Sequence, residues 1–184
     1  MRITGGEYRG RLLQSPKDRS IRPTSDKVRQ AVFNILHSRD AVVGAAVLDA
    51  FCGTGALGLE AVSRGALCCT FMDKNRRSLE LAKDNFAALK IDAKENFVLK
   101  DVSKPGPLLQ GVEPATLVFL DPPYRQGLVQ QSMPALRENG WIAPSATLLI
   151  ETESDFLADL LLPLGCTIDM VRDYGETRII LATL

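Results

Sequence analysis

The sequence predicts an α/β protein with a doubly wound, mostly parallel sheet, and three observations lead to this fold class. Short apolar runs alternate with segments of helical periodicity along most of the chain. Two apolar runs near the C-terminus are separated only by residues 173–176, which predicts an antiparallel hairpin at the end of the sheet. No apolar run approaches the ~20 residues that a membrane-spanning helix needs.

The composition is that of one globular domain: 184 residues, of which 46% are hydrophobic. The N-terminus lacks the apolar stretch of a secretory signal, so we expect a cytoplasmic protein with no membrane partner. The four cysteines show no CxxC spacing, and the single histidine, His37, lies far from them, so we expect reduced thiols and no metal. We expect a monomer.

The first 39 residues carry an excess of positive charge. They hold nine arginines and lysines against three acidic residues, whereas the whole chain has a net charge of zero. Such a charge run can be a solvated loop, but arginine suits the forked geometry of phosphate, which favours a nucleic-acid partner. Tyr8, Arg9 and Arg11 place an aromatic ring among cations, a combination that can stack on bases and contact phosphates.

Residues 1–23 are expected to form a basic arm, separate from a main domain that covers residues 24–184. Glycines punctuate the arm, and 2–4 and 11–14 have the composition of two short strands that pair as a hairpin. The main domain begins with a helix, because Pro23 can set its entry and apolar residues then recur at helical spacing.

The remaining elements follow from their patterns. Continuous apolar runs predict buried strands, and apolar residues spaced three and four apart predict helices that pack on them. We expect strands over 46–51, 67–72, 97–100, 117–120 and 146–151, then hairpin strands over 167–172 and 178–182. We expect helices over 57–64, 78–89, 128–138 and 156–162, and one helical turn at 108–109.

The strand over 117–120 ends abruptly in Asp121-Pro122-Pro123-Tyr124. Two prolines cannot continue a sheet ladder, so the carboxylate of Asp121 lies in a stiff turn at the carboxyl end of a buried strand. Ligands bind at that edge of open α/β sheets. A carboxylate, a proline carbonyl and an aromatic ring can hold a planar group that bears an amine, such as a nucleobase. A strand-ending turn with a solvated aspartate is the plainer interpretation.

A glycine pattern, Gly53, Gly55 and Gly58, follows the strand over 46–51 and precedes a helix. This GxGxxG spacing allows a tight turn and close approach of a ligand to the backbone, but it does not separate NAD from other adenosine cofactors. Asp49 favours a cationic ligand over a pyrophosphate because its carboxylate lies just before the turn.

Acidic residues also end the next two strands: Asp73 can accept from ribose hydroxyls and Asp101 from an adenine amine. Each could be a surface residue at a strand end. Together with Asp49 and Asp121, however, they place one acid at the end of each of four successive strands, which indicates a ligand site.

These residues resemble the S-adenosylmethionine-dependent methyltransferases with a DPPY-type motif, and among them the RsmD family of bacterial small-subunit rRNA guanine-N2 methyltransferases. The resemblance covers nearly the whole chain. It rests on Ile3-Thr4-Gly5-Gly6 with Gly10-Arg11, on Arg22-Pro23-Thr24 with Phe33-Asn34-Ile35-Leu36, on residues 48–61 and 63–66, on Asp121-Pro122-Pro123-Tyr124, on Asn139-Gly140-Trp141 and on residues 174–178.

The resemblance implies a Rossmann-like methyltransferase fold with S-adenosylmethionine as cofactor. The loop from Asp49 to Gly58 would hold its methionine part and sulfonium, Asp73 its ribose and Asp101 its adenine. The implied cofactor contacts are Thr24, Asp49, Phe51, Gly53, Gly55, Asp73 and Asp101. Many relatives of the wider class have glycine where this chain has Phe51, and the family often has glutamate where it has Asp73.

The substrate implied by the resemblance is guanine 966 of 16S rRNA, within an assembling small ribosomal subunit. Asp121 and the Pro122 carbonyl would hold the N2 amine, and Tyr124 would stack on the base. Arg9, Arg11 and Arg22 would contact RNA. The proton that leaves N2 would go to Asp121 or to water.

Three other functions remain open from the sequence. One is an adenine-N6 or cytosine-N4 methyltransferase of DNA or RNA, because these enzymes share the DPPY-type motif. Another is an NAD-dependent oxidoreductase built on the glycine pattern, although the single histidine leaves no obvious proton donor. A non-catalytic RNA-binding assembly factor with the same fold is the third.

Overall fold

The computed structural model of the protein describes residues 1–15 and 26–184. Its seven strands belong to one sheet. They are β1 (Ala46–Ala50), β2 (Cys68–Asp73), β3 (Lys94–Leu99), β4 (Ala115–Leu120), β5 (Ile142–Glu153), β6 (Thr167–Tyr174) and β7 (Thr177–Thr183).

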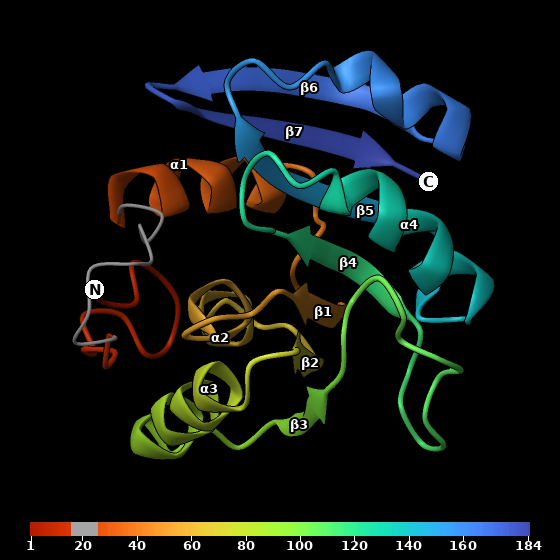
Figure 1. Ribbon diagram of the computed structural model, residues 1–184. Helices are drawn as coiled ribbons and strands as arrows, with labels where there is room; N and C mark the ends of the chain where they lie inside the picture. The colour runs from red at the N-terminus through yellow and green to blue at the C-terminus, as the bar shows by residue number, and fades with distance from the viewer. Residues whose placement is uncertain (16–25) are drawn as a thin grey trace.

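The sheet has the order β3-β2-β1-β4-β5-β7-β6, which Figure 1 shows from bottom to top. The strands β1 to β5 pair in parallel, and β7 runs antiparallel to both β5 and β6. The predicted fold class is therefore confirmed. The chain order reverses between β1 and β4, so the carboxyl ends of these two strands flank the crevice where open α/β sheets bind ligands.

Helices cover both faces of the sheet (Figure 1). The helices α1 (Asp26–His37), α2 (Ala56–Ser63) and α3 (Arg76–Leu89) pack on one face, and α4 (Leu128–Glu138) and the 3₁₀-helix η1 (Ala158–Leu164) pack on the other. Two apolar clusters fill the space between the layers, which explains why the parallel strands read as continuous apolar runs. No described helix is long and apolar enough to cross a membrane.

One expected helix is shifted and one expected helical turn is absent. The helix expected over 156–162 is the 3₁₀-helix η1 over Ala158–Leu164, which contains Pro163 and therefore lacks one N–H donor. The turn expected at 108–109 is not helical: Pro105 and Pro107 interrupt the segment, and a single bond from the Val112 N–H to the Leu109 carbonyl closes a turn after it. Propensity cannot decide such short segments between sheet elements.

Other elements differ from their expected bounds. The strand β5 starts four residues earlier than expected, at Ile142, and contains a register shift opposite Ala115 and Leu117. The hairpin strands extend to Tyr174 and Thr177, so only Gly175 and Glu176 join them. Gly175 has a φ of 67°, in the left-handed region that a two-residue hairpin turn requires.

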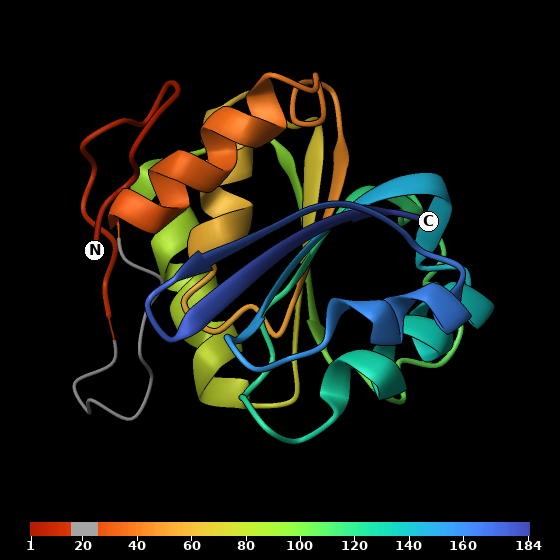
Figure 2. The same cartoon turned by 90° about the horizontal axis from the view of Figure 1, so that it is seen from above.

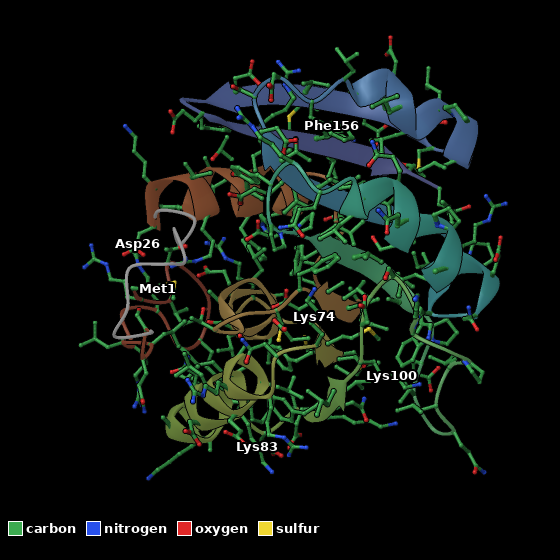
Figure 3. All side chains as sticks on the ribbon, viewed as in Figure 1. Met1, Asp26, Lys74, Lys83, Lys100 and Phe156 are labelled. Carbon is green, nitrogen blue, oxygen red and sulfur yellow. The ribbon has the colours of Figure 1, made fainter. Side chains whose placement is uncertain are left out.

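The described part of the arm, residues 1–15, packs closely on the helices. Arg2 and Leu12 form an isolated antiparallel bridge, as the predicted hairpin requires, while Ile3 and Leu13 are buried in the same cluster as α1 to α3. Figure 3 labels Met1 and Asp26, which lie on the same side of the molecule, where the arm meets the start of α1. The expected boundary between residues 23 and 24 lies outside the described residues.

A buried ionic network fastens the arm. Glu60 of α2 accepts from the Thr4 N–H and hydroxyl, both at 2.8 Å, and pairs with Arg64 at 2.8 Å. It also pairs with Arg29 of α1 at 3.3 Å, and the side chains of Arg29 and Glu60 are fully buried. Since breaking a buried ion pair leaves an uncompensated charge, this network fixes the arm against α1 and α2.

Candidate active site

The turn after β1, residues 51–58, is here called the glycine turn. Phe51, Gly53 and Gly55 have φ angles of 64°, 53° and 76°, all in the left-handed region. This conformation favours glycine, so Phe51 occupies a strained position, of the kind that clusters at functional sites. The half-buried ring of Phe51 packs against the apolar cluster on the α4 face.

Asp49 lies beneath the glycine turn, with only 2% of its surface exposed. Its Oδ2 accepts a hydrogen bond from the Gly58 N–H at 2.9 Å. Burial raises the pKa of Asp49 to about 8; the Gly58 bond opposes this rise and the charge of Asp73 adds to it. A carboxyl group that is costly to ionise gains most from a positive charge nearby.

Only glycine fits at position 58, because the neighbouring side chains leave no room for a Cβ atom. A Cβ atom at this position would lie 2.5 Å from the ring of Phe71, 2.6 Å from the Cys69 sulfur and 3.1 Å from the Asp49 Oδ2. The last glycine of the pattern therefore lets α2 pack directly onto β1 and β2. The turn and the carboxylate of Asp49 are thereby held together at the end of the sheet.

Asp73 and Asp101 lie at the ends of the two strands beyond β1. Asp73 accepts from the Gly53 N–H at 3.0 Å through Oδ2 and from the Asn75 N–H at 2.8 Å through Oδ1, so it braces the glycine turn. Asp101 accepts from the Ser103 hydroxyl at 2.7 Å and the Ser103 N–H at 2.9 Å. These two bonds lower the pKa of Asp101 below its usual range.

Asp121 follows β4 directly, and β4 pairs with β1 up to Leu120 and Ala50. Asp121 keeps part of its surface exposed, yet loss of water around its carboxyl raises its pKa well above the ordinary range. The negative charges of Glu151 and Asp49 raise this pKa further. The pairing of β1 with β4 thus brings Asp121 close enough to Asp49 for the charge of one carboxylate to affect the pKa of the other.

The sequence did not single out two residues that hold Tyr124. Its hydroxyl lies 3.0 Å from the Thr177 hydroxyl on β7 and donates to Glu151 on β5 at 3.3 Å. Burial raises the pKa of Tyr124 to about 12; the Thr177 bond lowers it and the Glu151 and Asp121 charges raise it. Glu151 could have been found from the sequence, because it is an acidic residue directly after the apolar run at 148–150.

A pocket of about 270 Å³ opens on the α4 side of the Asp121–Tyr124 segment. Pro122, Pro123, Gln130 and Phe156 are among its lining residues, whereas Asp49, Asp73 and Asp101 are not. It therefore lies beside the DPPY segment and is separate from the glycine turn.

The candidate RNA contacts lie on the arm. Arg9 and Arg11 are exposed, and within the described residues no carboxylate pairs with either of them. Figure 2 shows the arm at the same end of the molecule as the tip of the β6–β7 hairpin, where β5 also ends. The predicted contacts Arg22 and Thr24 lie outside the described residues.

Among the described residues, no group of three or more histidine, cysteine, aspartate or glutamate side chains could hold a metal ion. The four cysteines are free and buried. The site therefore consists of strand-end carboxylates, backbone groups of the glycine turn and the aromatic ring of Tyr124.

A doubly wound sheet with a glycine turn, strand-end acids and an antiparallel final pair of strands defines a class, the Rossmann-like S-adenosylmethionine-dependent methyltransferases. The family model described as "Conserved hypothetical protein 95" matches residues 1–183. The chain belongs to this family, which is the RsmD family. Its cofactor is S-adenosylmethionine.

Individual relatives agree with this assignment. The chain is 39% identical to Ribosomal RNA small subunit methyltransferase D of Escherichia coli K12 over 153 residues, which cover 83% of this chain and 75% of the relative. It is 35% identical to the Haemophilus influenzae Rd protein of the same name over 156 residues, 84% of this chain and 80% of the relative. The solved structure of Escherichia coli yhhF superposes with a TM-score of 0.79 at 33% identity, over 100% of this chain and 97% of that one.

Proposed function

We propose that this protein transfers the methyl group of S-adenosylmethionine to N2 of guanine 966 in 16S rRNA, within the small ribosomal subunit. The observation that carries the proposal is the pairing of β1 with β4 up to Ala50 and Leu120, which brings Asp49 and Asp121 to the switch point of the sheet. One acid belongs to the turn that suits a cationic cofactor, and the other begins the DPPY segment. The names of the relatives support rRNA as the substrate.

The residues that would hold the cofactor fit its chemistry. Asp49 gains most from a neighbouring cation, and a sulfonium is one. Asp73 and Asp101 offer carboxylate oxygens for ribose hydroxyls and the adenine amine, and each oxygen can accept more than one hydrogen bond. Phe51 and Gly53 are partly exposed at the turn, Gly55 supports its left-handed backbone, and Thr24 is proposed to close over the methionine end.

The bound cofactor supplies an electrophilic methyl group, so the protein mainly aligns the reacting atoms. The guanine N2 is a poor nucleophile because its lone pair is delocalised into the ring. Hydrogen bonds from its two N–H groups to the Asp121 carboxylate and the Pro122 carbonyl favour a pyramidal nitrogen and stabilise the charge that develops there. When bound, S-adenosylmethionine would supply the methyl group to this nitrogen and leave as S-adenosylhomocysteine, while Asp121 and Pro122 would hold the amine in place.

Asp121 is proposed to take the proton that N2 then loses. A positive charge at the glycine turn opposes the rise of the pKa of Asp121 and favours its ionised form before transfer. Once that charge is gone, burial and the Glu151 carboxylate raise its proton affinity again. Tyr124 stacks on the base, and its hydroxyl bonds to Glu151 and Thr177 fix the ring.

Arg9, Arg11 and Arg22 are proposed to contact the rRNA backbone. Replacing Arg9 and Arg11 with glutamine should weaken binding of 16S rRNA, with a larger loss at low salt than at high salt. A filter-binding series from low to high salt measures this effect. Unchanged affinity of the double variant across the series would remove the arm from RNA binding.

The deciding experiment is methyl transfer to small subunits isolated from cells that lack this protein, followed by mapping of methylated nucleosides. N2-methylguanine at position 966 is expected. N6-methyladenine or N4-methylcytosine would favour the alternative methyltransferases, and RNA binding without transfer would favour an assembly factor. Comparison with naked 16S rRNA tests whether the assembled particle is the substrate.

A further inference from the structure

Asn85 of α3 connects the arm to the glycine turn. Only 1% of its surface is exposed. Its Oδ1 accepts from the Gln14 N–H at 2.7 Å, and its Nδ2 donates to the Gln14 carbonyl at 3.1 Å. The same Nδ2 donates to the Thr54 carbonyl at 3.0 Å.

These three bonds use both amide N–H donors and the carbonyl acceptor of the side chain. Gln14 belongs to the arm that carries Arg9 and Arg11, whereas Thr54 lies between Gly53 and Gly55 in the glycine turn. If either segment moves, a buried amide group loses its partner, which is costly. The position of each segment therefore depends on the position of the other.

The other fastenings of the arm do not reach the turn. In the described part of the chain, Thr4 bonds to Glu60, and Tyr8 and Glu7 bond to Ser63, all toward α2. The face of α3 that carries Asn85, by contrast, also supports the turn: a Cβ atom on Gly55 would lie 3.0 Å from the Ala82 Cβ. Asn85 is thus placed where the arm, α3 and the turn meet.

We propose that Asn85 is a positioning residue that couples RNA binding on the arm to cofactor binding on the glycine turn. The inference rests on the proposed function, because it needs both ligands to bind this chain. A ligand that fixes one segment lowers the cost of fixing the other, so the two ligands bind with positive cooperativity. Each ligand then strengthens the binding of the other by the same factor.

The test measures the affinity of the full chain for S-adenosylhomocysteine, a non-reacting probe of the cofactor site, with and without 16S rRNA. In the unaltered protein, RNA is expected to tighten this binding by at least about 5-fold, the lower end of typical coupling between sites. In Asn85→Ala and Asn85→Asp the gain is expected to fall below about 2-fold. The aspartate keeps the acceptor for the Gln14 N–H and loses both donations.

Two controls separate coupling from general damage. Asn96→Ala removes the amide that donates to the Thr70 hydroxyl at 3.2 Å, away from the site, and should keep the full coupling. Gln14→Ala should also keep it, because both bonds of Gln14 to Asn85 use backbone atoms. Thermal unfolding shows which variants are folded. If Asn85→Ala does not fold, the test of coupling relies on Asn85→Asp, which changes the shape of the side chain less.

Coupling retained in folded Asn85 variants, or absent from the unaltered protein, would overturn the inference. These outcomes differ from failure of the proposed function, which appears in the unaltered protein as a lack of methyl transfer to the small subunit. Methyl transfer without coupling between the two ligands contradicts only the role of Asn85 and leaves the proposed reaction standing. Coupling that is lost in the Asn85 variants, in a protein that shows no methyl transfer, supports that role and contradicts the proposed reaction.

Discussion

Two pairs of aspartates at one edge of the sheet differ in what surrounds their carboxylates. Asp49 and Asp121, on the strands that flank the switch point, have lost most of their hydration, and their pKa values are raised. Asp73, at the end of β2, and Asp101, just after β3, are partly exposed and accept from backbone N–H groups. Asp49 and Asp121 therefore attract cations and protons at the centre of the sheet edge. Asp73 and Asp101, farther from the switch point, act as hydrogen-bond acceptors.

The largest effect is expected at Asp121. Asp121→Asn keeps the shape and one acceptor oxygen but cannot take a proton, so methyl transfer should fall about 1,000-fold. Affinity for S-adenosylhomocysteine should change little, as calorimetry can measure. Substantial transfer by this variant, or by Asp121→Ala, would remove Asp121 from the reaction.

At Asp49 the expected loss is in cofactor affinity. Asp49→Asn removes the negative charge beneath the glycine turn, and the affinity for S-adenosylmethionine should fall about 10- to 100-fold, the value of a hydrogen bond to a charged group. Transfer at saturating cofactor should fall less than in Asp121→Asn. Equal affinities of Asp49→Asn and the unaltered protein would show that the central pair does not attract the cofactor.

The same substitution should stabilise the ligand-free protein. Because folding raises the pKa of Asp49 from 3.8 to about 8, the folded state binds more protons than the unfolded state between these values. Its free energy of unfolding therefore falls as pH rises through this window. Asp49→Asn should raise the melting temperature by several degrees at pH 8 and by less at pH 5. A larger gain at pH 5 would contradict the raised pKa.

The smallest effect is expected at the outer strands. Asp101→Asn keeps one acceptor oxygen in a partly exposed setting, so cofactor affinity should fall only about 3- to 5-fold. Ser103→Ala serves as its control, since it removes one bond to the carboxylate and leaves the charge. An effect of Asp101→Asn as large as that of Asp49→Asn would erase the difference between the two pairs.

The sequence was sufficient for the architecture and for the positions of the strand-end acids. The spacing of apolar residues and the continuous apolar runs indicate where each strand lies. Parallel pairing of the strands then brings Asp49, Asp73, Asp101 and Asp121 to one edge of the sheet. The raised pKa values were not predictable, because they depend on how closely α2 packs over Asp49 and on Glu151 beside Asp121. The bonds from Tyr124 to Thr177 and from Asn85 to Gln14 join segments far apart in sequence, and no local pattern indicates them.

The two outermost strands of the sheet, β3 and β6, have a consequence for how molecules of this protein meet one another. Lys94 and Glu95 are exposed on β3, and Arg172 and Asp173 on β6, so charged groups line both borders. Charges at such borders oppose strand-by-strand addition of another chain, the route to aggregation in sheet proteins. The charged edge strands therefore hinder aggregation of a protein whose sheet has two open edges.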